Sequence, residues 1–512
     1  MQAAKKVTVN TAISYFRLII TVVISFYSTR LVLNSLGAID YGIFNLISGV
    51  VAMLSFLNVA MSTSTQRFFS YYHGSEIKNV QKKIFTNSVV IHLIIAIIVV
   101  VILELSGLFL ISNFLKIPES RIDIALKLFH FMGLSVFFTI VSVPFTALLN
   151  AHENLIVIAI VNILEAIFKI LIALTLDLIN IDKLLLYGIL INSISIVSTG
   201  FYLTYCIRKY EECTLIRLFE MDKVLVRKLL SFAGWNLFGS ICFLGRTQGI
   251  AVLLNLFHGA VVNAAYGISN QVSAQMNYLS VSMLQSLNPQ IMKSEGMNDR
   301  ERVLRLSMMA CKFSYFLFAF IAIPSIVEMD EILSFWLNSI PIYSSIFCSL
   351  LLVGMLINQL TIGIQSGLQA VGKIKHYQFI VGTLILLNLP ISFILLSSGY
   401  EPYFVFITFI FIEILACCIR LLFLKKEGGL DIMEYVNRVL LKISFPTFTI
   451  IAVALTCRYL FSFPNRFIVT FLFSISCFVI SILLTGLYKD EKELLENFIL
   501  KFSKGRKLLN WK

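Results

Sequence analysis

Fourteen apolar stretches, each long enough to cross a lipid bilayer, fill almost the whole of this 512-residue chain. A transmembrane helix needs about 20 predominantly apolar residues. The sequence therefore predicts an all-α integral membrane protein with about 14 transmembrane helices. The predicted spans are residues 9–33, 41–65, 85–111, 126–149, 154–177, 184–207, 229–256, 261–289, 303–327, 342–369, 376–398, 402–424, 438–460 and 466–487.

The composition excludes a soluble protein. Hydrophobic residues make up 58% of the chain and charged residues only 13%, and the mean hydropathy is +0.89. Soluble proteins hold more charge and fewer apolar residues. The nine cysteines lie mostly inside predicted spans and show no CxxC spacing. We interpret them as packing residues, and we expect no metal and no cofactor.

The basic residues predict the orientation. With a cytoplasmic N-terminus, the inward-facing segments hold about 30 of the 41 Lys and Arg residues and the outward loops about six, as the positive-inside rule requires. We therefore expect a multi-pass membrane protein with both termini in the cytoplasm. The net charge of +13 follows mostly from this bias and from a basic tail suited to anionic lipids. Nucleic acid is a poor partner for such a chain.

A weak internal repeat relates the first six spans to the next six at an offset near 220 residues. Leu33 to Gly37 reappears as Leu254 to Gly259, and Leu149-Asn150-Ala151 reappears as Leu368-Gln369-Ala370. Two copies in the same orientation predict two six-helix bundles around a central cavity, plus two C-terminal helices. The predicted organisation is bundles at 1–208 and 229–425, a cytoplasmic linker at 209–228, two additional helices at 426–488 and a basic cytoplasmic tail at 489–512.

Charged residues inside spans are the first candidates for function, because a charge at the bilayer centre costs roughly 2.5–3.5 kcal/mol on insertion scales. Arg17 and Arg246 occupy corresponding spans of the two halves and could present paired donors to a diphosphate, although a structural ion pair is the alternative for each. Arg30 lies close enough to the outer interface to extend its charge into water. The candidates are Arg17, Arg30, Glu165, Lys169, Arg246 and Glu413.

The acidic candidates have two interpretations. Glu165 and Lys169 stand one helical turn apart, so an internal ion pair is the simpler interpretation and a coupling-ion site the alternative. Glu413 is expected to lack a partner on its own helix, which makes it a second candidate for a coupling ion.

Polar stripes at helical spacing predict a wet cavity, although small and polar residues also mediate plain helix packing. Amides on such a face could bind sugar hydroxyls. Span two carries a related pattern of Asn45, Ser48, Ser55, Ser62 and Thr63. On the eighth span the stripe comprises Asn263, Gly267, Asn270, Ala274 and Asn277, with Gln271 and Gln275 alongside.

Several segments together resemble one transporter family. These are LNSLGAIDYGIFNLISGV entering span two, SFAGWNLFGS opening span seven, AAYGISNQV entering span eight and GLQAVGKIKHY leaving span ten. In order and position they resemble Wzx-type O-antigen and polysaccharide flippases of the MOP (MATE-like) exporter superfamily. The resemblance implies transport of an undecaprenyl-pyrophosphate-linked oligosaccharide, with membrane lipids, a polysaccharide polymerase and chain-length proteins as further partners.

Two other functions compete with this interpretation. A cation-coupled multidrug exporter of the MATE type would need acidic residues in the cavity, whereas Arg17 and Arg246 are basic and favour an anionic cargo. A membrane glycosyltransferase or polymerase would need a sizeable outward loop or an acidic pair near the membrane surface. The sequence contains no nucleotide-binding loop, nucleophile motif or metal-spaced cluster. We therefore expect a transporter rather than an enzyme.

Overall fold

The computed structural model describes residues 55–492 except 75–77, 114–117, 177–181, 214–221, 338–339 and 489–490, together with scattered positions between 13 and 48. Every regular element in this described part is a helix, which confirms the predicted all-α class. The described residues divide into two compact units, one within Asn10–Leu237 and one within Phe238–Lys512.

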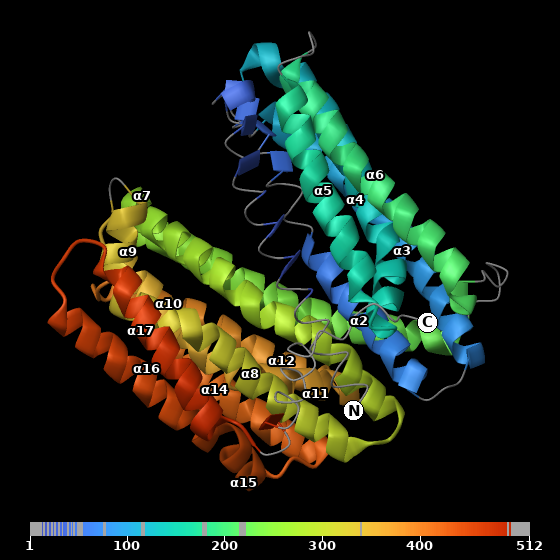
Figure 1. Cartoon of the computed structure of the whole chain (residues 1–512). Coiled ribbons are helices and arrows are strands. Elements are labelled where there is room, and N and C mark those ends of the chain that lie inside the picture. Colours follow the sequence, from blue (N-terminus) through green and yellow to red (C-terminus); the bar gives the residue numbers. More distant parts are fainter. Residues whose placement is uncertain are drawn as a thin grey trace, which may run out of the picture. The chain divides into compact units, whose positions relative to one another are not determined.

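The N-terminal unit is built around one central helix (Figure 1). α4 (Ile122–Ala151) packs against α2 (Ser55–Gly74), α3 (Lys78–Asn113) and α6 (Lys183–Lys209), while α5 (Leu155–Thr175) packs on α6. Its core joins Leu103 of α3, Leu128 and Phe129 of α4, and Leu184 of α6, all almost fully buried. Short 3-10 helices, η1 (Glu119–Arg121) and η3 (Glu211–Cys213), lie before α4 and after α6.

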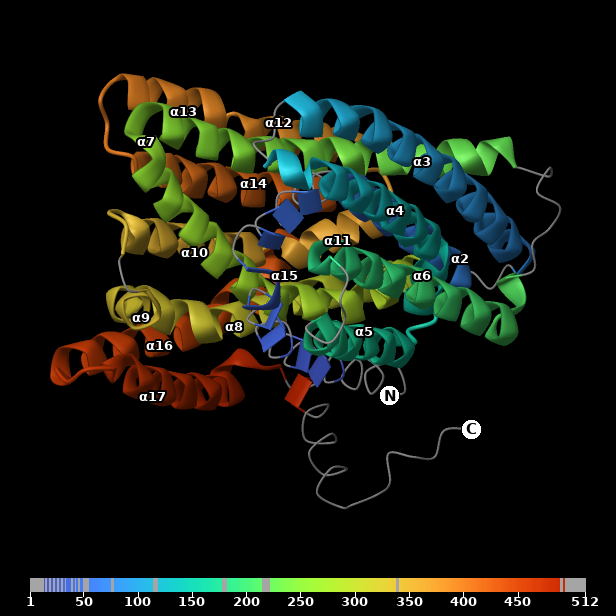
Figure 2. The same cartoon turned by 90° about the horizontal axis from the view of Figure 1, so that it is seen from above.

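The C-terminal unit has α8 at its centre, in contact with α10, α11, α16 and α17. The last two long helices, α16 and α17, lie side by side at the edge of this bundle (Figure 2). The elements are α7 (Lys223–Gly296, shared with the N-terminal unit), α8 (Arg300–Val327), α9 (Met329–Trp336), α10 (Ser344–Gln359), α11 (Ile362–Val371), α12 (Lys375–Leu386), α13 (Asn388–Ser397), α14 (Phe404–Gly428), α15 (Ile432–Tyr435), η4 (Val436–Leu440), α16 (Leu441–Leu460), α17 (Arg466–Ser481) and η5 (Ile482–Gly486).

Short polar side chains mark where helices begin. The Asp182 carboxylate accepts from the Leu185 backbone N–H at 3.1 Å, and Asp299 accepts from Arg302 at 3.1 Å. Each aspartate satisfies one of the backbone donors that a helix leaves free at its N-terminus. α7 is two helices joined at Gly259, where φ is +79°, a conformation that glycine adopts without steric cost.

The backbone preserves traces of the internal repeat. Gly37 and Gly259, which stand at equivalent positions in the two halves, both have positive φ values, +75° and +79°. Glu153 and Gly372, each two residues after the matched Asn150-Ala151 and Gln369-Ala370, also have positive φ values, +58° and +87°. Equivalent helices start near the same offset, at Lys78 and Arg300 for α3 and α8. These paired turns support the predicted duplication.

Ten helices are long and apolar enough to cross a membrane, or eleven if the bent pair α10 and α11 is one span. This count covers only the described residues, and predicted spans 9–33 and 41–65 lie largely outside them. The predicted span 261–289 is helical as the second half of α7 but is not among the ten. Its asparagine and glutamine side chains lower its hydropathy.

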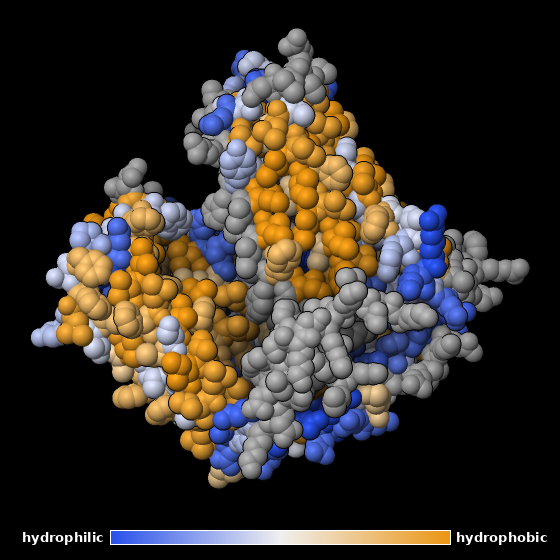
Figure 3. Space-filling view, in the orientation of Figure 1, coloured by the Kyte–Doolittle hydropathy of each residue, from blue (hydrophilic) through white to orange (hydrophobic). Residues whose placement is uncertain are grey.

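The exposed flanks of the helices carry the side chains that lipid tails solvate. On α3, Ile94, Ile97, Ile98 and Val101 each expose about half of their surface. Figure 3 shows hydrophobic residues covering the sides of helices in both units. In water such faces would cost far more than single exposed apolar residues do. The chain is a multi-pass membrane protein.

The topology predicts the side of the membrane on which reporter fusions emerge. A fusion after Ser334 in α9, or after Asn338, which is outside the described residues, should read periplasmic, and one after Leu430 should read cytoplasmic. Paired phosphatase and fluorescent-protein fusions measure this. The reverse result at either place would contradict the predicted orientation of all the spans.

Candidate functional site

A fully buried charge cluster lies inside the C-terminal unit. Glu413 of α14 is 2% exposed and Arg246 of α7 is 6% exposed. The Arg420 Nη1 atom, two turns along α14, lies 3.1 Å from Glu413 Oε1, and Arg246 Nη1 lies 3.6 Å from Glu413 Oε2. The structure thus joins two of the predicted site residues, Arg246 and Glu413, in an ion pair.

The expectation that Glu413 lacks a partner on its own helix is wrong. Residues seven apart lie on the same face of a helix, and Arg420 reaches back along that face to the carboxylate. Arg420 is 3% exposed and was missed among the intramembrane charges of the sequence. Because two guanidinium groups face Glu413, a proton taken up there would leave both cations without a counter-charge. That arrangement argues against a role for Glu413 as a proton carrier.

The cluster stabilises a break between α10 and α11, where the chain bends by 43°. Asn358 donates a hydrogen bond to Glu413, and Arg420 donates to the Thr361 hydroxyl at 3.1 Å. The Tyr435 hydroxyl donates to the Leu360 carbonyl at 2.6 Å. Breaks inside spans are tolerated where protein groups satisfy the freed backbone. Charge cluster and bend therefore form one structural unit.

The cluster holds one positive charge more than its carboxylate balances. Arg246 Nη1 is buried and makes no hydrogen bond among the described residues, and its guanidinium lies 4.7 Å from the Phe409 ring centre and 5.2 Å from that of Phe243. Aromatic faces attract a cation but offset only part of the cost of burying it. A buried arginine that shares its carboxylate with a second arginine is a feature expected at a functional site rather than in a purely structural core.

The predicted polar stripe on α7 divides into two faces. Asn263, Asn270 and Asn277 are half-buried, and Asn277 accepts a hydrogen bond from Gln359 Nε2 at 3.3 Å. Gln271 is exposed together with its neighbours at helical spacing, Gly267, Ala274 and Gln275. This exposed face of glycine, alanine and amides contrasts with the isoleucine and valine face of α3. Such a surface suits water better than lipid tails.

In the N-terminal unit, Arg17 and Glu165 both lie close enough to the Tyr202 hydroxyl to act on it electrostatically. Arg17 is half-buried, so the structure places it in a polar group of three rather than against lipid. Arg30 lies outside the described residues. The binding roles predicted for both arginines remain predictions.

The predicted ion pair between Glu165 and Lys169 does not form, although the structure describes both side chains. Lys169 is exposed, whereas Glu165 is half-buried and lies near enough to Tyr202 to act on it electrostatically. One helical turn brings two side chains within reach, but Lys169 is long enough to place its charge in water instead.

This geometry predicts different effects for the two residues. Lys169→Gln should leave protein level and transport near those of the unchanged protein, because its charge pairs with no residue that the structure describes. Glu165→Gln should lower transport more than protein level, since it removes the charge beside Tyr202 and Arg17. Immunoblots of membranes and a transport assay measure both effects. If each single variant lost function and the double variant Glu165→Gln, Lys169→Gln recovered it, the two residues would form a structural pair after all.

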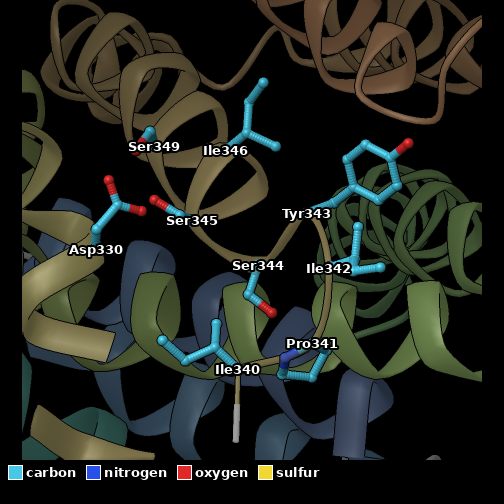
Figure 4. A pocket seen from close by; sticks show the side chains of 9 residues that line it. All are labelled: Asp330, Ile340, Pro341, Ile342, Tyr343, Ser344, Ser345, Ile346 and Ser349. Atoms are coloured by element: carbon cyan, nitrogen blue, oxygen red, sulfur yellow. The ribbon is translucent and has the colours of Figure 1, made fainter. Parts of the chain in front are cut away.

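A shallow hollow of about 560 Å³ lies where α9 approaches the start of α10 (Figure 4). It offers one carboxylate and a few hydroxyls but no cation, so it is poorly suited to a diphosphate. None of the predicted site residues contributes to it. Its lining residues are Asp330, Ile340, Pro341, Ile342, Tyr343, Ser344, Ser345, Ile346 and Ser349.

Comparison with known proteins identifies a family for the sequence and similar structures for the fold. Residues 3–295 match the model of a family described as polysaccharide biosynthesis protein. No curated protein matches the sequence. Among solved structures, the chain is similar to a MATE transporter in its bent conformation, with a TM-score of 0.73 and 12% identity over 84% of this chain and 96% of that chain.

Two further structures share the fold. A MOP superfamily transporter from Pyrococcus furiosus, described as having a binding pocket of reverse polarity, has a TM-score of 0.70 and 11% identity, covering 83% of this chain and 95% of that one. An outward-facing multidrug resistance MATE family transporter has a TM-score of 0.67 and 11% identity over the same shares. At these identities the likeness shows the fold alone, and it confirms the MATE-like architecture.

Proposed function

The chain belongs to the polysaccharide biosynthesis protein family, and from this premise we propose that it is a flippase for an undecaprenyl-pyrophosphate-linked oligosaccharide. It moves this lipid-linked sugar across the bacterial inner membrane by alternating access, for the assembly of O-antigen, capsule or another surface polysaccharide. Its termini lie in the cytoplasm. A polysaccharide polymerase and chain-length proteins then act on the delivered sugar.

The observation that carries the proposal is the sign of the buried charge. Two arginines and one glutamate leave the cluster of the C-terminal unit with a net positive charge. Arg17 supplies a further cation in the N-terminal unit. Exporters of cationic drugs need acidic cavities, whereas a pyrophosphate needs basic ones. A transporter of the same fold is described as having a binding pocket of reverse polarity, so pocket polarity varies within this fold.

Arg246 is the better candidate of the two clustered arginines for contacting pyrophosphate. Its ion pair with Glu413 is longer, 3.6 Å against 3.1 Å for Arg420, and its Nη1 atom makes no hydrogen bond in the described structure. Arg420 is held additionally by Thr361. Releasing Arg246 therefore costs less, and it would leave a neutral Glu413–Arg420 pair behind. Alternating access would expose Arg246 when α7 moves away from α14.

The exposed face of α7 supplies a route for the sugars. Gln271 and Gln275 offer amide donors and acceptors, while Gly267 and Ala274 leave room beside them. Hydroxyl-rich sugars are bound by such groups and are excluded by lipid-facing isoleucine. We assign the half-buried Asn263, Asn270 and Asn277 to shaping this face and holding its amides in place.

Three acidic groups near helix ends are already paired, which disfavours a catalytic role for them. In the C-terminal unit, Glu328 binds Arg466 Nε at 3.0 Å and also accepts from Thr470 at 2.9 Å, and Arg466 lies 3.7 Å from Glu331. In the N-terminal unit, Arg121 binds Asp40 at 2.8 Å. A transferase would need such carboxylates free to act as base or metal ligand.

Reconstitution tests the proposal directly. Proteoliposomes would hold undecaprenyl-pyrophosphate-linked N-acetylglucosamine with a fluorophore on the sugar, and a membrane-impermeant reductant would quench the outer leaflet. Empty liposomes should lose about half of the signal, and liposomes with the protein nearly all of it. A phosphatidylcholine with the same fluorophore is the control for nonspecific scrambling.

The outcomes separate the candidate functions. Quenching of the pyrophosphate-linked sugar alone supports the flippase. Equal quenching of both lipids means an unspecific scramblase, and transport of a fluorescent drug cation without movement of either lipid means a multidrug exporter. Either result overturns the proposal, as does the absence of all movement from correctly folded protein.

A further inference from the structure

Three ligand-type side chains from distant parts of the sequence meet at one end of the N-terminal unit. They are His73 at the end of α2, His152 in the turn after α4 and Glu212 in η3 after α6. His152 Nε2 lies 3.3 Å from Glu212 Oε1, and one ligand atom from each of the three residues lies within 4.8 Å of the others. The two imidazole ring centres are 4.5 Å apart.

The His152 ring is oriented by its neighbours. The Tyr210 ring stacks on it at a centre-to-centre distance of 4.3 Å. Asn154 Nδ2 in turn donates to the Tyr210 hydroxyl at 3.1 Å and to the Tyr205 hydroxyl at 3.0 Å. Supporting contacts of this kind hold the imidazole of a metal-ligating histidine in a fixed orientation. The cluster thus has one preorganised ligand before any ion binds.

We propose that His73, His152 and Glu212 bind a divalent transition metal such as Zn²⁺ and so tie together the C-terminal ends of α2, α4 and α6. Two imidazoles and a carboxylate are ligands that zinc accepts, with bonds near 2.0–2.2 Å. Tetrahedral bonds of that length separate neighbouring ligand atoms by roughly 3.4 Å. The pair at 3.3 Å already has this spacing, and closing the others requires only small side-chain rotations.

Metal binding would replace the direct contact between His152 Nε2 and Glu212 Oε1 with two bonds to the ion. Water would complete the fourth position around the metal. No metal-type spacing appears in the sequence because the three ligands are separated by whole helices. The expectation of no metal is therefore replaced by this proposal.

The same unit offers a matched control. His130 of α4 and Glu104 of α3 also form a histidine–carboxylate pair, at 2.5 Å, but no third ligand joins them among the residues that the structure describes. A pair of this kind should bind zinc weakly. Loss of zinc binding on changing the trio but not the pair would show that the third ligand matters.

Equilibrium titration with Zn²⁺ tests the proposal on the full chain, purified in detergent with its tag removed and treated with chelator. The unchanged protein should bind one zinc ion at micromolar concentration. His73→Gln and Glu212→Gln, which keep side-chain size, should each weaken binding at least tenfold, and His130→Gln should not. Co²⁺ should give the visible absorption of a four-coordinate ion in the unchanged protein and lose it in Glu212→Gln.

Three results would overturn the site. The first is that the unchanged protein shows no saturable zinc binding. The second is that His73→Gln and Glu212→Gln still bind zinc, and the third is that His130→Gln loses binding equally. Size-exclusion profiles show whether each variant is folded. If both trio variants fail to fold, the cobalt spectrum of the unchanged protein decides alone, since its absence at saturating Co²⁺ excludes a four-coordinate site.

Discussion

Glu413→Gln is expected to remove most of the folded protein from the membrane. Glu413 is the common carboxylate of two buried guanidinium groups, at 3.1 Å from Arg420 and 3.6 Å from Arg246. Removing one partner of a buried ion pair typically costs about 3–5 kcal/mol, because the remaining charge stays buried and uncompensated. Here two charges would be left. Quantitative immunoblots of membranes and thermal unfolding in detergent measure the loss.

Two variants complete this test. Glu401→Gln makes the same chemical change on an exposed carboxylate that accepts from Tyr343, and it should leave the protein level unchanged. The double variant Glu413→Gln, Arg420→Gln restores the original charge imbalance and should recover part of the protein. Normal levels of the single variant would mean that the cluster contributes little to folding. A double variant worse than the single one would show that Arg420 acts through the α10–α11 bend rather than through charge.

Most of the helical framework could be predicted from the sequence, because each helix that crosses the bilayer must be apolar over the thickness of the hydrocarbon core. Spans such as 154–177 and 466–487 correspond closely to α5 and to α17 with η5. The bends within spans could not be predicted from the sequence. The α10–α11 break carries no proline at its centre and is held by Tyr435, Thr361 and Arg420, which come together only in the folded unit.

The charge partners were predicted less well, for a physical reason. Proximity along one helix suggested the pair Glu165 and Lys169, yet lysine can extend its charge away from a neighbour. The same reasoning, applied to residues two helical turns apart instead of one, predicts the pair that forms, Glu413 and Arg420. Lys312 of α8, 1% exposed, pairs at 2.5 Å with Glu491, far along the chain. No local pattern predicts a contact of that kind.

Arg246→Ala is expected to abolish transport while the protein level stays normal. Removing this arginine leaves Glu413 and Arg420 as a neutral pair at 3.1 Å, so the buried core loses an uncompensated charge rather than gaining one. The variant also removes the guanidinium that we assign to the pyrophosphate. Arg246→Lys keeps the charge but loses the paired donors, so it should retain part of the transport. The quenching assay and immunoblots on the same membranes measure both quantities.

Arg438→Ala is the control, because Arg438 forms a partly exposed ion pair with Glu434 at 2.8 Å and such pairs contribute little. It should keep both transport and protein level. Full transport by Arg246→Ala would exclude Arg246 from the binding site. Loss of the protein itself would instead make Arg246 a structural residue, and the excess buried charge would then need another explanation. Loss of transport at a normal protein level would support a guanidinium that leaves Glu413 to bind a pyrophosphate. A residue that merely stabilised the bend would lower transport and protein level together.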